Sequence, residues 1–397
     1  MPAQTKVRIK IVDADGHYVE PPHDIPKFID PKYEGIAPRV VKRGDKEFWE
    51  GKGWWLDNPA TYRMATGSIP ATAISGLAGV ERWNRGAEID NVKNLNYTQM
   101  NPAALQPSAR LTVLDTEHID AVVLYPTFNL QWIADGEYHQ AVNRALNDWL
   151  GQEYIAVAPQ RMYGAVNIGA IHDVEWACAE VRRCVAKYGF KAVYLRMSHA
   201  KPDARWFGEQ YDALWATCQE LDVAVGFHPY PGDTMYGSSR YFDMIGPSAI
   251  QQFARGPLNH PVDAMNVITG LISGGILERF PSLRFAILES SGGWLVSLLE
   301  RLDHRFEHLG HVVPHLKMKP SDYFRRQGWI SFDPDEAPLA LTARWLGADR
   351  IIWGSDFPHP DAFYPNFIQM LNGQISELTS DEQDRIRGLN ARDFYKL

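Results

Sequence analysis

The segment DVEWACAEVRRCVAKYGFKAVYLRM, residues 173–197, contains the two patterns that decide the fold. Residues 173–189 have the apolar spacing of an amphipathic helix. Residues 191–197 form a short apolar and β-branched run, which is typical of a buried strand. A helix followed directly by such a strand is the repeating unit of α/β proteins with a parallel sheet.

The same alternation recurs along the chain. Helical stretches over 138–153 and 207–222 precede two further strands. The expected strands are eight in number and comprise residues 10–17, 121–127, 163–169, 191–197, 222–230, 284–290, 329–334 and 351–359. Eight such units predict an α/β fold, a closed (β/α)8 TIM barrel, with the active site at the carboxyl ends of the strands. We expect residues 1–397 to form a single barrel domain.

Two connections are longer than a barrel needs. Residues 18–120 separate the first two strands and are rich in Trp, Tyr, Pro and Gly, with weak periodicity. Long connections are usually functional or disordered, and the aromatic content argues against disorder. We therefore interpret 18–120 as a lid or small subdomain over the barrel mouth. Residues 229–283 begin with a second loop, YPGDTMYGSSRYF, and continue into a helix predicted from residue 261 onward.

Composition excludes several classes of protein. The chain has 397 residues, 45% of them apolar, with a formal net charge of −8. This mild acidity argues against nucleic acid or an anionic membrane as a partner. The three cysteines form no CxxC pair, so neither a disulfide framework nor a zinc finger is indicated. Because there is no apolar leader and no run of membrane-spanning length, we expect a cytoplasmic enzyme of small molecules.

Polar side chains stand where the expected strands end. Asp15 and His17 alternate on the first strand, so that both point to one face. The others, at or just after later strands, are Arg196, His228, Glu289, Asp356 and His359. These ends converge in a barrel. Two imidazoles with two or three carboxylates form a site for a divalent ion such as Zn²⁺, Mn²⁺ or Fe²⁺.

These residues resemble the amidohydrolase superfamily, in particular its decarboxylase-like branch, which includes aminocarboxymuconate-semialdehyde and dihydroxybenzoate decarboxylases. The family pattern of E/D-x-H on strand one, His on strand five and Asp on strand eight matches Asp15, His17, His228 and Asp356. The segments GSDFPHP (354–360) and GGILERFPSLRFAILESSGGW (274–294) are also typical of this branch. The resemblance implies that the four matching residues, with Glu289, are metal ligands.

Two positions depart from the family pattern. Glu289 replaces the strand-six histidine of the decarboxylases. Arg196 stands where binuclear amidohydrolases carry a bridging carboxylated lysine, which argues against a lysine-bridged metal pair. A pair bridged by Glu289 stays open, so we expect one or two ions, zinc in the first place and iron or manganese as alternatives.

The expected reaction is hydrolysis or non-oxidative decarboxylation of a small carboxylate-bearing substrate. Asp356 is a ligand or general base, and Glu289 is a second acid/base group or a second-metal ligand. Arg196 is expected to hold a substrate carboxylate, unless it forms only a structural ion pair. His359 is expected to orient Asp356 or to donate to substrate. The resemblance also implies a homo- or hetero-oligomer.

Three alternatives remain at this stage. Some relatives of this branch are dinuclear iron or manganese enzymes, so an oxygenase or thioester hydrolase on the same scaffold is the second hypothesis. A non-catalytic metal-binding subunit of a hetero-oligomer is the third. The stretch HRFEH, residues 304–308, matches the HxxEH of some zinc peptidases, but it lies on an amphipathic helix whose polar residues are expected to face solvent.

Overall fold

The computed structural model describes residues 9–52, 68–71, 76–78, 95–128, 135–169, 171, 173–197, 207–229, 248–360 and 362–397, with only the backbone described for 68–70 and 248–256. The loop expected at the barrel mouth over 230–242 lies outside these residues. So does much of the long connection, between 53 and 94.

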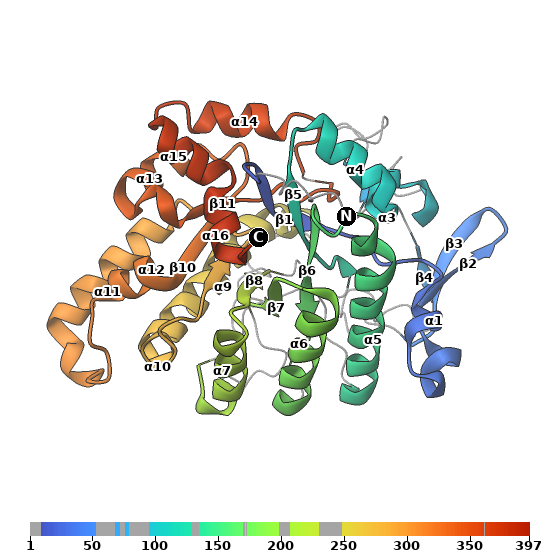
Figure 1. Cartoon of the computed structure of the whole chain (residues 1–397), viewed down its shortest axis with the longest axis horizontal. Coiled ribbons are helices and arrows are strands. Elements are labelled where there is room, and N and C mark those ends of the chain that lie inside the picture. Colours follow the sequence, from blue (N-terminus) through green and yellow to red (C-terminus); the bar gives the residue numbers. More distant parts are fainter. Residues whose placement is uncertain are drawn as a thin grey trace, which may run out of the picture.

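Eight parallel strands form a nearly closed barrel with helices around it (Figure 1). Their order in the sheet follows their order in the chain: β1 (Val12–His17), β5 (Ala121–Tyr125), β6 (Met162–Asn167), β7 (Ala192–Arg196), β8 (Ala224–His228), β9 (Phe285–Ile287), β10 (Gly328–Phe332) and β11 (Ile351–Trp353). The predicted fold class is confirmed. The last strand is shorter than expected, because residues 354–359 leave the sheet as a turn.

The barrel closes through the turn that follows β11. There the backbone N–H of Asp356 donates to the carbonyl oxygen of Asp15 at 3.0 Å, and the N–H of His17 donates to that of Phe357 at 2.9 Å. Gly354 makes this approach possible, since a Cβ atom at this position would lie 2.5 Å from Asp15 Cβ. The first and last strands of the barrel are therefore joined at the level of the polar strand ends.

The inside of the barrel combines small residues with several large ones, such as Tyr194 and Ile352. One buried cluster contains the inward-facing alanines of six strands: Ala14, Ala121, Ala165, Ala192, Ala224 and Ala286. Tyr125 and the C-terminal helix α16 (Asn390–Tyr395) add bulk at this centre, because Tyr395 Oη donates to Ala14 O at 2.7 Å and lies 3.0 Å from Tyr125 Oη. Alternate residues such as Val122 and Phe227 pack outward in the main core.

The surrounding helices follow the expected βα order. They are α4 (Pro107–Thr116), α5 (Gly136–Trp149), α6 (Val174–Tyr188), α7 (Asp212–Glu220), α11 (Leu295–Leu309), α12 (Pro320–Gln327) and α13 (Leu339–Leu346), with α14 (Phe367–Gln374) and α15 (Ser380–Asp384) preceding α16. Helix α6 ends where Gly189 adopts a left-handed conformation, φ 68°, which costs glycine little.

The described part of 18–120 contains a small antiparallel sheet. Its strands are β2 (Arg39–Arg43), β3 (Lys46–Glu50) and β4 (Ser68–Pro70), preceded by α1 (Ile25–Phe28) and followed by α3 (Pro102–Leu105). Val40 and Trp49 share a buried cluster with Tyr138, Val142 and Leu146 of α5. A barrel helix therefore forms the base on which this sheet packs, beside the barrel in Figure 1.

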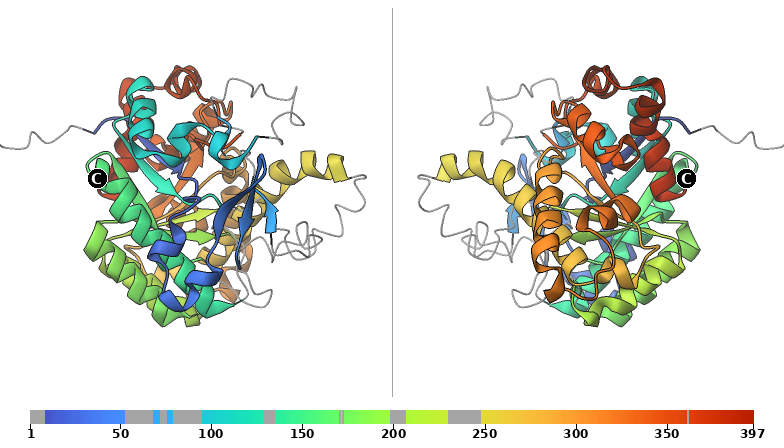
Figure 2. Two further views of the ribbon diagram at one scale, coloured as in Figure 1. Left: turned by 90° about the vertical axis from the view of Figure 1, so that its right-hand side faces the viewer. Right: turned by 90° about the vertical axis from the view of Figure 1, so that its left-hand side faces the viewer.

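The segment between β8 and β9 forms a longer helix than predicted. Helix α9 runs from Ser248 to Ser273 through Pro257 and Pro261, and α10 (Ile276–Arg279) follows it. The sequence placed the helix start at Pro261 because proline is unfavourable inside a helix; here the helix continues through both. Its first half projects away from the barrel (Figure 2). Neither α9 nor any other helix of the described residues is long and apolar enough to cross a membrane.

The close approach at the seam gives a first prediction. Gly354→Ala places a methyl group against Asp15, so it should lower the free energy of unfolding by about 1–3 kcal/mol and weaken metal binding. Urea denaturation and metal titration measure both effects. The control is Gly373→Ala in α14, where nothing lies within 4 Å; it should be neutral or stabilising by up to about 1 kcal/mol. Equal behaviour of the two variants would contradict the role of Gly354.

Candidate metal centre

An irregularity in β1 brings Asp15 and His17 into one site. The pairing register of β1 with β5 shifts between Asp13 and Gly16, and such bulges redirect side chains locally. His17 Nε2 lies 3.7 Å from Asp15 Oδ1, and both side chains are buried. The expectation that these two residues share a face agrees with this geometry, although the strand is not regular.

Two imidazoles face each other across the centre of the site. His17 Nδ1 lies 2.8 Å from the carbonyl oxygen of Pro126, and His228 Nδ1 lies 2.8 Å from that of Pro229. A carbonyl accepts only, so both Nδ1 atoms carry protons. The two Nε2 atoms, 3.2 Å apart, then direct their lone pairs toward each other unless a proton or cation lies between them.

The donor set therefore fits a divalent ion. Asp15, His17 and His228 each offer one ligand atom, all within 4.8 Å of one another. Asp15 Oδ1 is buried and has no hydrogen-bond donor among the described residues. Orphaned buried polar atoms are rare and call for an unseen partner such as an ion. Imidazole nitrogen and carboxylate oxygen suit Zn²⁺, Mn²⁺ or Fe²⁺.

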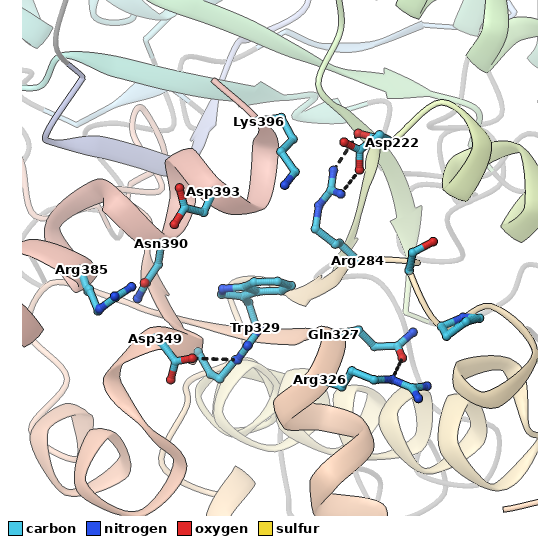
Figure 3. A pocket seen from close by; sticks show the side chains of 13 residues that line it. Asp222, Arg284, Arg326, Gln327, Trp329, Asp349, Arg385, Asn390, Asp393 and Lys396 are labelled. Atoms are coloured by element: carbon cyan, nitrogen blue, oxygen red, sulfur yellow. Dashed lines mark hydrogen bonds and ion pairs between the residues drawn. The ribbon is translucent and has the colours of Figure 1, made fainter. Parts of the chain in front are cut away.

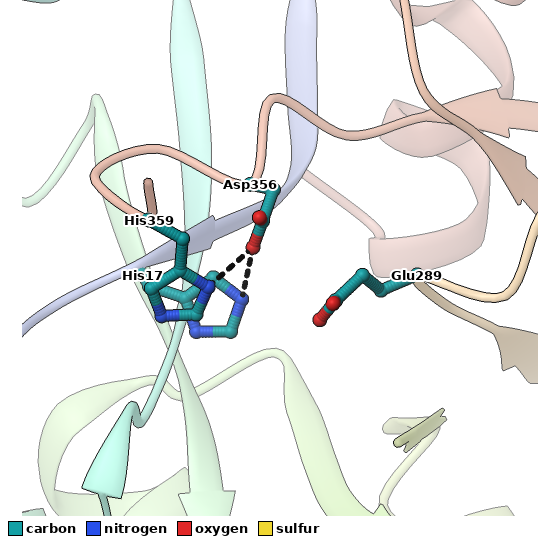
Figure 4. A group of neighbouring side chains, drawn as sticks. All are labelled: His17, Glu289, Asp356 and His359. Carbon is teal, nitrogen blue, oxygen red and sulfur yellow. Dashed lines mark hydrogen bonds and ion pairs between the residues drawn. The ribbon is translucent and has the colours of Figure 1, made fainter. Parts of the chain in front are cut away.

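Asp356 and His359 extend the site along the seam (Figure 4). Asp356 Oδ1 lies 3.4 Å from His17 Nε2 and 2.6 Å from His359 Nδ1. His359 Nε2 contacts Thr127 Oγ1 at 3.1 Å, and this hydroxyl itself donates to the carbonyl oxygen of Tyr18. Since both ring nitrogens of His359 face acceptors, the imidazolium form satisfies both. The Nδ1–H of His359 thus donates to the Asp356 carboxylate.

Glu289 enters the site from the opposite side (Figure 4). It follows β9 in a left-handed conformation, φ 40°, which is unusual for a residue with a side chain and is a feature of functional sites. Its carboxylate lies 3.0 Å from His228 Nε2. Burial acts to raise the pKa of Glu289, but the adjacent imidazole of His228 outweighs it and lowers the pKa to about 2.

When no ion is bound, the charges of the site are balanced by protons on its own side chains. Burial raises the pKa of Asp15 to about 8 and holds the pKa of His17 well below its usual value. Burial also opposes protonation of His228, yet the carboxylates of Asp15 and Glu289 raise its pKa to about 9. A divalent ion satisfies the same carboxylates without these protons.

A buried arginine positions the turn that carries Asp356. Both terminal nitrogens of Arg110, from α4, donate to the carbonyl oxygen of Phe357 at 3.1 Å. On the other side, the Asp13 carboxylate accepts from the backbone N–H and the hydroxyl of Ser355, at 2.9 and 2.6 Å. Asp13 thus supports the turn from one side and Arg110 from the other.

Arg196 lies at the end of β7, as expected from the sequence, and the structure shows that it is largely buried. It interacts with Asp263 of α9, and burial raises the pKa of Asp263 to about 6 although the arginine acts to lower it. His260, one turn earlier on α9, lies 4.0 Å from Glu289. Sequence reasoning missed both α9 residues, whose i, i+3 spacing on one helix face was the available signal.

Glu20 and the HxxEH stretch lie outside the metal centre. The carboxylate of Glu20 accepts from the backbone N–H groups of Thr127 and Phe128, at 3.1 and 2.9 Å, and so anchors the loop that contacts His359. His304 and His308 of the HxxEH stretch are exposed on α11. Glu307 of the same stretch pairs with Lys319, which removes support for a peptidase site.

The family model described as "Amidohydrolase" matches residues 12–397. The chain belongs to the amidohydrolase family. Gamma-resorcylate decarboxylase of Polaromonas sp. is 25% identical over 303 residues, which are 72% of this chain and 86% of that one. The decarboxylase-like branch expected from the sequence is confirmed, and with it the expectation of a metal-dependent enzyme.

Solved structures share the fold. An amidohydrolase from Mycobacterium avium subsp. paratuberculosis superposes with a TM-score of 0.73 at 20% identity, covering 98% of this chain and 99% of that one. A dihydroxybenzoic acid decarboxylase from Polaromonas sp. has a TM-score of 0.62 at 23% identity, covering 76% and 89%. That structure contains manganese and the inhibitor 2-nitroresorcinol.

The facing imidazoles predict that His228 is a metal ligand. His228→Gln should weaken Mn²⁺ binding by about 100-fold or more, since residues that only orient metal ligands already contribute about 10- to 100-fold. Mass spectrometry of the metal content and titration calorimetry measure this. His304→Gln, an exposed histidine, is the control and should bind metal like the wild type. Full metal content in His228→Gln would exclude His228 as a ligand.

Asp263 predicts a pH dependence of stability. Its pKa in the folded protein, about 6, lies above its unfolded value, so its contribution to stability is present at pH 4 and is lost as the pH rises through 6. The variant Asp263→Asn cannot ionise, so it does not lose this stability as the pH rises. Relative to wild type, the variant should gain up to about 3 kcal/mol in free energy of unfolding between pH 4 and pH 7. A difference that stays constant with pH, in parallel urea denaturations, would contradict the assignment.

Proposed function

We propose that this enzyme catalyses the manganese-dependent, non-oxidative decarboxylation of a small aromatic carboxylate that carries a ring hydroxyl group. The observation that carries the proposal is the pair of facing Nε2 atoms of His17 and His228, with Asp15 and the His359–Asp356 pair beside them. The names of the relatives, decarboxylases of hydroxylated benzoates, support the reaction, and the manganese in a solved neighbour supports the metal.

Asp15, His17, His228 and Asp356 would hold the ion. When bound, it supplies positive charge that anchors an anionic substrate oxygen and offsets charge developing on the ring. We assign a single ion to these four residues. Zinc, named first from the sequence, stays the alternative metal.

The reaction replaces the carboxylate by hydrogen. A C–H bond forms at the ring carbon that carries the carboxylate, then the C–C bond breaks, its electron pair returns to the ring, and CO₂ leaves. We assign delivery of this proton to Asp356. The proton that His359 Nδ1 donates to Asp356 Oδ1, 2.6 Å away, passes through this carboxyl group to the ring carbon and leaves His359 neutral. His359 then takes up a proton from solvent, which restores the pair for the next turnover.

Glu289 takes a different role from the histidine that the decarboxylase pattern has on this strand. We assign the Glu289 carboxylate, which faces His17 and Asp356 across the site (Figure 4), to accept the proton of the substrate's ring hydroxyl and to return it to the product after CO₂ has left. Withdrawing this proton increases the electron density of the ring and favours protonation at the adjacent carbon. We assign Arg196, near α9, to contact the part of the substrate that lies away from the ion.

The test is an assay of the manganese-loaded protein with 2,6-dihydroxybenzoate, following CO₂ and resorcinol. Asp356→Asn and Glu289→Gln should each lower kcat by about 100-fold or more, the size of a general acid–base contribution. Benzoate, without ring hydroxyl groups, should not react. The control His304→Gln should keep wild-type kcat.

Metal stoichiometry separates this proposal from the dinuclear one. One manganese per chain, with decarboxylation, supports the single-ion assignment. Two ions per chain, with no CO₂ release from hydroxybenzoates and turnover of thioesters or consumption of O₂, would replace it by a dinuclear hydrolase or oxygenase. If both carboxylate variants still catalysed decarboxylation, the roles assigned to Asp356 and Glu289 would be wrong, although the proposed reaction would stand.

A further inference from the structure

A second cavity, of about 500 Å³, lies at the amino ends of β9, β10 and β11. Arg284, Gln327 and Arg350 each directly precede one of these strands and line the cavity (Figure 3). The metal centre lies at the carboxyl ends of β9 and β11. The two sites share no residue, so the cavity has no part in the chemistry described above.

The lining is cationic although the chain is acidic. It contains five positively charged side chains, Arg284, Arg326, Arg350, Arg385 and Lys396. Its three carboxylates are Asp222, Asp349 and Asp393. The lining therefore has an excess of two positive charges, whereas the whole chain has a formal net charge of −8. Concave cationic surfaces concentrate anions.

Two of the five cations are paired within the lining: Arg284 with Asp222, and Arg350 with Asp349 at 3.3 Å. The third carboxylate, Asp393, pairs at 3.1 Å with Arg392, which does not line the cavity. The other three cations have no carboxylate partner among the described residues; of these, Arg326 donates to Gln327 and to the carbonyl oxygen of Leu277, and the remaining two are Arg385 and Lys396. Arg385 instead adds its positive charge near Arg350, whose pKa is lowered by burial and also by this neighbour. Like charges brought together in this way are relieved by an anion.

Trp329 adds an unsatisfied donor to the same wall. Its side chain lies at the centre of the ring of lining residues (Figure 3) and is only 7% exposed. Arg350 stacks over the indole at 4.7 Å, and Phe394 packs against it with ring centroids 5.0 Å apart. Its Nε1–H, however, has no acceptor among the described residues. A buried donor without an acceptor is destabilising, so an acceptor oxygen placed here would stabilise this wall.

We propose that this cavity binds the phosphate group of a small phosphorylated molecule. A phosphate dianion carries the two negative charges that the lining lacks, and its oxygens accept from the Arg385 guanidinium, the Lys396 ammonium and the Trp329 indole. Guanidinium groups pair with phosphate in forked geometry. The cavity is larger than phosphate alone requires, which leaves room for the remainder of a phosphate ester.

The experiment is titration calorimetry of the manganese-loaded full chain with inorganic phosphate and with glucose 6-phosphate, at constant ionic strength, with glucose as the uncharged probe. Both phosphates should bind, and glucose should not. Arg385→Gln/Lys396→Gln should weaken binding at least about tenfold, and Trp329→Phe about two- to tenfold, the sizes expected for charged and neutral hydrogen bonds. Tighter binding of glucose 6-phosphate than of inorganic phosphate identifies an ester as the ligand, and equal binding identifies the free ion.

The control is Arg301→Gln/Arg305→Gln, which removes two exposed cations of α11. It should bind phosphate like the wild type. If Arg385→Gln/Lys396→Gln bound phosphate as tightly as the wild type, the phosphate would bind elsewhere, for example on the active-site manganese. This result would overturn the proposal. So would the absence of binding to the wild type. Decarboxylase activity does not enter this test, so its outcome is independent of the proposed reaction.

Discussion

Two backbone hydrogen bonds between the start and the end of the barrel hold the metal centre together. They join Asp356 to Asp15 and His17 to Phe357. Without them, the carboxylates of the first and last strands would lie in separate parts of the barrel mouth. The groups that support this seam lie far apart in the chain: Asp13 and Ser355, which share two hydrogen bonds, are separated by 342 positions. The site therefore forms only when the barrel is complete, since contacts this distant in sequence form late.

The contacts at the seam also explain how several carboxylates can be buried in the metal centre. Desolvating a carboxylate costs several kcal/mol unless it is paired. Three carboxylates here have their own compensation. Asp13 receives two hydrogen bonds from Ser355, Asp356 pairs with His359, and Glu289 pairs with His228. Asp15 instead keeps an oxygen without a donor among the described residues, and it lies 3.7 Å from the Nε2 atom of each facing imidazole.

Periodicity and position were enough to predict the barrel and the convergence of its strand ends. Strand alternation depends on local composition, so all eight strands were found, and Asp15, His17, His228, Glu289 and Asp356 followed from standing at their ends. The limits came from non-local effects. The prolines of α9 concealed the first half of that helix and, with it, the position of His260 beside the site. Asp263 lay within the predicted helix, but its interaction with Arg196 of β7 depends on tertiary packing. Arg110 could not be recognised because its only marked feature is burial beneath a turn 247 positions away.

The small sheet of the long insertion shares its core with α5, and this restricts how the mouth of the barrel can open. If the described part of 18–120 swung away as one body, it would expose Trp49, which is 3% exposed, together with its partners on α5. Exposing one such tryptophan costs on the order of 4–6 kcal/mol. We infer that this part of the insertion is a fixed wall of the molecule. Opening of the barrel mouth therefore depends on movements smaller than the displacement of this sheet.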